Sequence, residues 1–233
     1  MNIVDVVVLV ILAIGIIYGM YKGFLYSLIN IGTVILAALL SLLLSPIMSS
    51  NTVTGEFYPS IINYTDGAQR ITDISLVHTP ISELSESQIS SALTNAKFPE
   101  PVNKLLAENI AGHRLADKGF TTLGEYFDNS VAIIITNIVC FMLLYLIIRA
   151  VCIILLNGVN FVTPLPVLKS FDAFLGGCCG AVKSILFLFV LFMIVPVIFT
   201  FLNYESIRDM LESSALGNFF YKYNFLLSFI GGI

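Results

Sequence analysis

Charge is scarce in this sequence, and tryptophan is absent altogether. Only 11% of the 233 residues are charged, whereas a soluble domain carries about 25%. Hydrophobic residues make up 58% of the chain, and the mean hydropathy is +0.95. Such a chain cannot cover its surface with enough charge to remain in water, and it is too apolar to stay disordered. Because no stretch alternates with the period of a strand, the composition predicts an all-α integral membrane protein.

Basic residues and cysteines are also few, and this limits the possible partners. The net charge is −4, so we expect no nucleic-acid partner, because phosphate binding needs an excess of Lys and Arg. The four cysteines contain no CxxC pair, and the two histidines, His78 and His113, lie far apart in the sequence. A disulfide framework and a zinc site are therefore excluded. We expect neither a metal nor another cofactor.

No sequence motif supports catalysis. The run from Gly177 to Ser184 resembles a phosphate-binding loop, but Val182 stands where that loop has a glycine before its Lys-Ser pair. The GxSxG motif of serine hydrolases is absent, and so is a Gly-x-Gly-Asp motif. We therefore expect no catalytic residues and no enzymatic activity.

Four apolar runs have the length of a membrane span. They contain 18 to 21 residues, or about 27 to 31 Å of helix at the usual rise, close to the thickness of the hydrocarbon core. Pro196 lies inside the last run and predicts a kink there. The sequence thus predicts four transmembrane helices, over Ile3–Met20, Phe24–Leu44, Val131–Ile148 and Ser184–Leu202.

The remaining segments complete a four-part organisation, with divisions at 1–44, 45–128, 129–202 and 203–233. The first part is a helical hairpin that turns at Lys22-Gly23, where glycine supplies a positive φ. The third part holds the last two spans and a cytoplasmic connection, in which Ala150–Val162 is expected to continue the third helix along the membrane surface. Within the tail, Phe219–Ile230 is expected to lie at the interface.

The segment 45–128 has the composition of a water-soluble insertion. It contains 10 acidic and 5 basic residues, and helix signals recur along it. Ser85 with Gln88 predicts a capping box that opens a helix through Ala96. Pro101 predicts the start of a second helix, and Gly112 predicts its end. Thr122 with Glu125 predicts a further cap, so we expect the helix of the third span to begin outside the membrane.

Basic residues abut the spans on one side only. Lys22, Arg149, Lys169 and Lys183 all fall on the same side if the four spans alternate in direction. The positive-inside rule then places this side in the cytoplasm. The insertion and both chain ends are expected outside.

Small residues and intramembrane charges are the candidates for function. Gly15, Gly19 and Gly23 repeat every four residues, as do Gly176 and Gly180, which predicts close packing of the first and fourth helices within one chain or between copies. Ionisable residues near membrane depth are functional candidates, although Asp5 and Arg149 more readily fix topology by reaching the headgroups. Lys183 lies near mid-bilayer if its helix starts at Asp172, and it then needs a cavity or a polar partner such as Asp172 or Ser184.

The combination of these motifs resembles the colicin V production (CvpA) family of bacterial inner-membrane proteins. The matching features are Asp5 early in the first span, the Lys22-Gly23-Phe24 turn, and the run from Asp172 through Gly176 and Gly180 to Lys183. The resemblance covers about residues 1–45 and 130–202, with a polar segment at residues 211–214 that is also similar. The long insertion, and Ser184 in place of a glycine, depart from the family pattern.

The resemblance implies a protein needed for toxin production or export and linked to envelope homeostasis. It supplies no catalytic mechanism, and it makes Asp5, Lys22, Asp172 and Lys183 the candidate polar residues. The expected partners are the lipid bilayer and a second copy of the chain or another membrane protein. The alternative is a small, oligomeric transporter or channel subunit in which Lys183 and Asp172 line a polar path.

Overall fold

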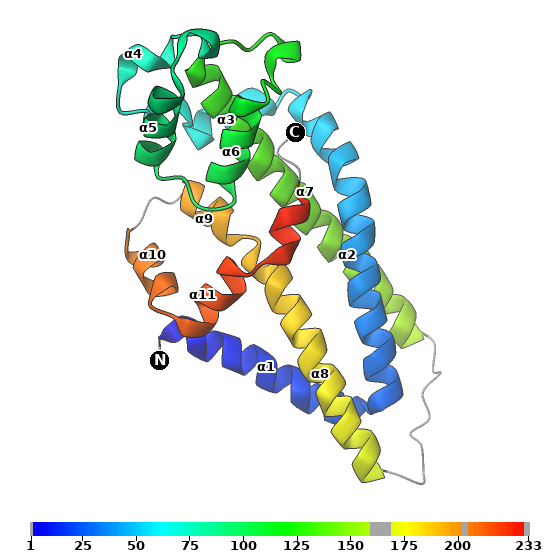
Figure 1. The fold of residues 1–233 in the computed structure, drawn as a ribbon. Helices are drawn as coiled ribbons and strands as arrows, with labels where there is room; N and C mark the ends of the chain where they lie inside the picture. The colour runs from blue at the N-terminus through cyan, green and yellow to red at the C-terminus, as the bar shows by residue number, and fades with distance from the viewer. Residues whose placement is uncertain (1, 159–168, 202–204, 231–233) are drawn as a thin grey trace. The chain divides into compact units, whose positions relative to one another are not determined.

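The computed structural model describes residues 2–158, 169–201 and 205–230, and it is 83% helical with no strand among them (Figure 1). Four segments of the described chain are long and apolar enough to cross a membrane. They are α1 (Ile3–Lys22), α2 (Phe24–Val53), α7 (Leu123–Gly158), and α8 (Lys169–Phe192) followed by α9 (Val195–Phe201). The prediction of an all-α membrane protein with four spanning helices is confirmed.

The helices differ from the predicted spans mainly at their ends. Helix α2 continues past Leu44 to Val53, because the residues that follow Leu44 carry no charge and Pro46 does not end the helix. Helix α7 begins at Leu123, where Glu125 and Thr122 make the predicted reciprocal cap, and it continues through Arg149 to Gly158. The rest of the predicted extension, residues 159–162, lies outside the described residues.

The fourth span begins earlier than predicted. Helix α8 starts at Lys169, so the predicted start of the span at Ser184 is wrong, and Lys183 lies inside the helix, as in the alternative of a helix that starts at Asp172. A single charge interrupts a hydropathy run, but it does not interrupt the backbone hydrogen bonds of a helix. The chain then turns at Met193 and Ile194, just before Pro196, whose ring disfavours an unbroken helix through this point. Leu202, the predicted end of the span, lies outside the described residues.

The described chain divides into two compact units. The first contains Met1–Leu44, Phe141–Met193 and Tyr204–Leu226. In it α1 packs along α8, and α11 (Ala215–Lys222) contacts both of them, with α10 (Glu205–Glu212) beside α11 (Figure 1). The rings of Phe220 and Phe225 lie 5.1 and 5.2 Å from that of Phe189. The segment expected to lie at the interface is thus partly packed onto α8.

The second unit contains Ser45–Cys140, Ile194–Asn203 and Leu227–Ile233. The insertion is helical, as predicted, and α5 opens with the predicted capping box at Ser85 and Gln88. Helix α6 ends at Gly112 as expected, and it buries Leu106 and Ile110. The helical segments of the insertion are α3 (Tyr58–Thr65), η1 (Ala68–Arg70), α4 (Ile74–Val77), η2 (Ile81–Glu83), α5 (Glu86–Ala96), α6 (Val102–Ala111) and η3 (Ala116–Lys118), while η4 (Phe225–Phe229) lies near the end of the chain.

Candidate functional site

Helices α1 and α8 touch backbone to backbone along the predicted glycines. A Cβ atom added to Gly19 would overlap the carbonyl oxygen of Gly176, and one added to Gly180 would overlap that of Gly15. Only residues without a side chain permit this approach, which provides the dispersion contacts that hold helices together in lipid. The contact is made within one chain and fixes the relative rotation of α1 and α8.

Asp172 and Lys22 lie at the turn that joins α1 to α2. Gly23 adopts a φ of 83°, and the N–H of Phe24 donates to the Asp172 carboxylate at 3.0 Å. The carboxylate therefore lies at the N-terminus of α2, where the helix dipole favours negative charge. The ammonium of Lys22 lies 5.2 Å from the ring centre of Tyr26 and 5.9 Å from that of Tyr18. These two candidate residues thus belong to the turn.

Asp5 lies at a second helix N-terminus, that of α11. Its carboxylate accepts hydrogen bonds from the Ser214 hydroxyl at 2.6 Å and from the N–H of Leu216 at 3.0 Å. It also accepts from the backbone N–H of Asn2 at 2.8 Å. Asp5 is 5% exposed, and its hydrogen bonds join the start of α1 to the start of α11.

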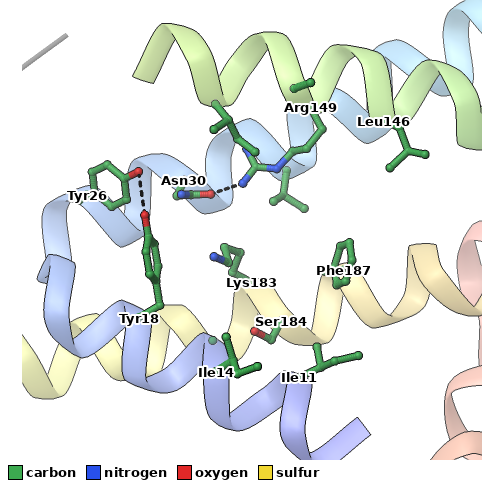
Figure 2. A pocket seen from close by; sticks show the side chains of 14 residues that line it. Ile11, Ile14, Tyr18, Tyr26, Asn30, Leu146, Arg149, Lys183, Ser184 and Phe187 are labelled. Atoms are coloured by element: carbon green, nitrogen blue, oxygen red, sulfur yellow. Dashed lines mark hydrogen bonds between the residues drawn. The ribbon is translucent and has the colours of Figure 1, made fainter. Parts of the chain in front are cut away.

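A cavity of about 640 Å³ lies between four helices of the first unit (Figure 2). Its polar lining comes from all four helices, with Tyr18 from α1, Tyr26 and Asn30 from α2, Arg149 from α7, and Lys183 and Ser184 from α8. Apolar side chains complete the wall, namely Ile11, Ile14, Val34, Leu146, Ile153 and Phe187, together with Gly15 and Ala150.

Arg149 is held at the edge of this cavity by α2. Its guanidinium donates one hydrogen bond to the side-chain oxygen of Asn30 and another to the Thr33 hydroxyl, the latter at 2.6 Å. Because α7 continues past Arg149, this arginine lies inside the helix, and its guanidinium is bound to α2. The polar residues inside the Phe24–Leu44 run, Asn30 and Thr33, were the sequence signal for this contact.

Lys183 extends from α8 toward Tyr18, and its ammonium lies 5.0 Å from the centre of that ring (Figure 2). The Tyr18 and Tyr26 hydroxyls are 3.4 Å apart, and the Tyr26 hydroxyl donates to Asn157 at 3.2 Å. Asp172 is not among the residues that line the cavity. The predicted pairing of Lys183 with Asp172 therefore does not describe this site. The aromatic partner Tyr18 could not be identified from sequence spacing alone.

The electrostatics of the cavity are one-sided. Arg149 and Lys183 are its charged lining residues, and no carboxylate is among the described residues that form the lining. The ammonium of Lys183 contacts the aromatic ring of Tyr18, and the guanidinium of Arg149 contacts the oxygens of Asn30 and Thr33. All of these partners are uncharged. The arrangement can therefore bind an anion. In the described part of the chain, no three His, Cys, Asp or Glu side chains gather as a metal site would require.

Comparison with known proteins identifies the family. The family model described as colicin V production protein matches residues 105–223, more than half of the 233 residues. The match includes Arg149, Asp172, Lys183 and Ser214, whereas α1 and α2 lie before it. Among curated proteins and among solved structures, no significant match was found. Together with its four membrane-spanning helices, the family match shows that this chain is a multi-pass membrane protein that belongs to the colicin V production protein family.

Proposed function

We propose that this protein supports toxin production or export and envelope homeostasis from the bacterial inner membrane, without catalysing a reaction. The name of the family supports a role in toxin production, and the family has no known enzymatic activity. In the proposed orientation, Lys22 faces the cytoplasm while both chain ends and the insertion lie outside.

The single observation that carries a binding role is the cavity with two cations between the spans. A lysine or arginine at the centre of a transmembrane helix costs roughly 2.5–3.5 kcal/mol on insertion scales. Arg149 and Lys183 both lie inside long apolar helices and both line the same space. A charge inside such a helix that makes no ion pair with a described residue is a candidate for binding rather than for fixing topology alone.

Replacing Lys183 tests this proposal. The Lys183→Gln variant removes the charge but keeps much of the side-chain length, so it should insert at the wild-type level. It should nevertheless fail to restore toxin export, or exclusion of a normally impermeant dye, in a strain that lacks the protein. Lys183→Arg should restore both at least in part, because it keeps the charge.

The matched control for this test is Lys104→Gln, which removes an exposed lysine of the insertion. It should complement fully. Full complementation by Lys183→Gln as well would contradict the binding role and leave the cavity without a function in these processes.

A small transporter or channel subunit is the second candidate. The observation that favours it is the size of the cavity, about 640 Å³, which falls in the range of small-molecule sites. Purified protein in vesicles loaded with chloride or inorganic phosphate should then release the anion faster than vesicles that contain Lys183→Gln. Equal release from the two preparations would exclude transport of these anions.

A further inference from the structure

We propose that the cavity binds the phosphate headgroup of an anionic lipid, whose acyl chains lie along the exposed apolar wall. This inference rests on one part of the proposed function, namely that the cavity binds a ligand. It names the class of ligand, an amphiphile with a phosphate group, which neither the family description nor the sequence motifs specify.

The charge of the site is the first argument. Arg149 and Lys183 line the same cavity from different helices, α7 and α8 (Figure 2). Neither cation makes an ion pair with a residue that the structure describes. Two uncompensated positive charges in a medium of low dielectric constant attract an anion far more strongly than they would in water.

The geometry of Arg149 favours a phosphate. Two of its N–H groups are used by Asn30 and Thr33, and a guanidinium has five donors in a rigid fork. The remaining donors can bind phosphate oxygens, while the two hydrogen bonds from α2 hold the fork in place. Lys183 adds a second positive charge, and the Ser184 hydroxyl belongs to the same lining.

The apolar side chains of the lining indicate that the cavity is open to the lipid phase. Four of the lining side chains are open to the surroundings in the protein alone, with exposed fractions of 61% for Ile14, 56% for Leu146, 40% for Ile153 and 37% for Phe187. All four belong to membrane-spanning helices, so in a bilayer these exposed surfaces meet acyl chains. A lipid can therefore enter the cavity laterally from the leaflet in which it resides.

The place of the cavity in the first unit favours an anchored anion over a free one. The ammonium groups of Lys183 and Lys22 lie 5.0 and 5.9 Å from the centre of the same ring, that of Tyr18, and Lys22 is the last residue of α1. In the proposed orientation the turn at Lys22 faces the cytoplasm, so this end of the cavity lies toward the layer of lipid headgroups. A phosphate attached to acyl chains is already anchored in that layer.

Binding of short-chain lipids to the purified, delipidated protein tests the proposal. Dioctanoyl phosphatidylglycerol should raise the thermal unfolding temperature and remain bound in native mass spectrometry. It should bind at least about tenfold more tightly than dioctanoyl phosphatidylcholine, as expected for one charge-assisted contact. Lys183→Gln should lose about tenfold in affinity for phosphatidylglycerol by the same reasoning, while Lys183→Arg and the control Lys104→Gln should bind like the wild type.

A second variant covers the possibility that Lys183→Gln does not fold. Asn30→Asp is nearly isosteric and places a carboxylate next to the Arg149 guanidinium. It should keep or raise the thermal stability of the lipid-free protein, because it supplies a counter-ion, yet lower the affinity for phosphatidylglycerol. Unchanged affinity in this variant would count against the site.

Three results would overturn the proposal. Equal binding of phosphatidylglycerol and phosphatidylcholine would show that the cavity does not select an anionic lipid. Unchanged phosphatidylglycerol binding by Lys183→Gln would place the lipid elsewhere. Inorganic phosphate that binds as tightly as phosphatidylglycerol would assign the cavity to a soluble anion. The complementation assay is independent, since Lys183→Gln could lose lipid binding and still support toxin export, which would contradict the proposed function alone.

Discussion

The Asp172 carboxylate caps the backbone of the α1–α2 turn. Asp172→Ala removes the acceptor for the N–H of Phe24 and should cost about 0.5–2 kcal/mol of stability, the usual value for a lost helix cap. Asp172→Asn keeps an acceptor oxygen and should lose less. Thermal unfolding of the purified variants in one detergent measures both effects.

The control for this prediction is Asp117→Ala, which removes an exposed carboxylate of the insertion. It should unfold at the wild-type temperature. If Asp172→Ala unfolded at that temperature too, the hydrogen bond to Phe24 would contribute nothing measurable to stability.

Tyr58 predicts a pH dependence in the insertion. Burial and the nearby Asp128 carboxylate raise the pKa of Tyr58 from 10.0 to about 12, and its hydroxyl donates to Asn129 at 3.1 Å. The folded protein therefore retains this proton more tightly than the unfolded chain. The resulting stabilisation is fully present below pH 10.0 and is lost as the pH rises through about 12.

The matched variant for this effect is Tyr58→Phe, which has no proton to lose. Between pH 10.0 and about 12, the thermal unfolding temperature of the wild type should fall more steeply than that of Tyr58→Phe. Parallel curves for the two proteins would show that the phenol does not titrate differently on folding.

At the scale of whole helices, the contact of α1 with α8 depends on the absence of side chains. Gly19→Ala or Gly180→Ala places a methyl group against a backbone carbonyl of the facing helix, which neither helix can move aside cheaply. Overpacking of this kind typically costs about 1–3 kcal/mol, so both variants should unfold at lower temperature in detergent.

Gly32→Ala is the control, because a Cβ atom at Gly32 in α2 meets open space. Alanine favours a helix over glycine by up to about 1 kcal/mol, so this variant should unfold at the same or a higher temperature. Equal unfolding temperatures for Gly19→Ala, Gly180→Ala and Gly32→Ala would argue against a close contact of α1 and α8.

At the scale of the whole molecule, the orientation in the membrane is a prediction from basic residues. In a chain without its native cysteines, Ser87→Cys in the insertion should react with an impermeant maleimide in cells whose outer membrane is permeable. Tyr21→Cys, beside the cytoplasmic turn, should react only after the inner membrane is opened. The reverse pattern would invert the topology.

Much of the architecture can be predicted from the sequence by local physical rules. The four apolar runs, such as Ile3–Met20, are long enough to cross the bilayer, and backbone groups in lipid must be satisfied within a helix. Capping at Ser85 and at Thr122 identifies helix starts, because the side chain and the N–H that it caps lie within three residues. The spacing of Gly15 and Gly19 indicates a packing face for the same local reason.

Only the tertiary structure decides which polar side chains meet inside the bundle. Lys183, Arg149 and Tyr18 line one cavity, whereas Asp172, three turns from Lys183 on the same helix, caps the α1–α2 turn. Sequence spacing could not separate these outcomes, because helices that are apolar on all sides have no amphipathic stripe to set their rotation. The backbone contact between Gly19 and Gly176 sets the rotation of α1 against α8, and through it the neighbours that α1 and its turn offer to Asp172 and Lys183.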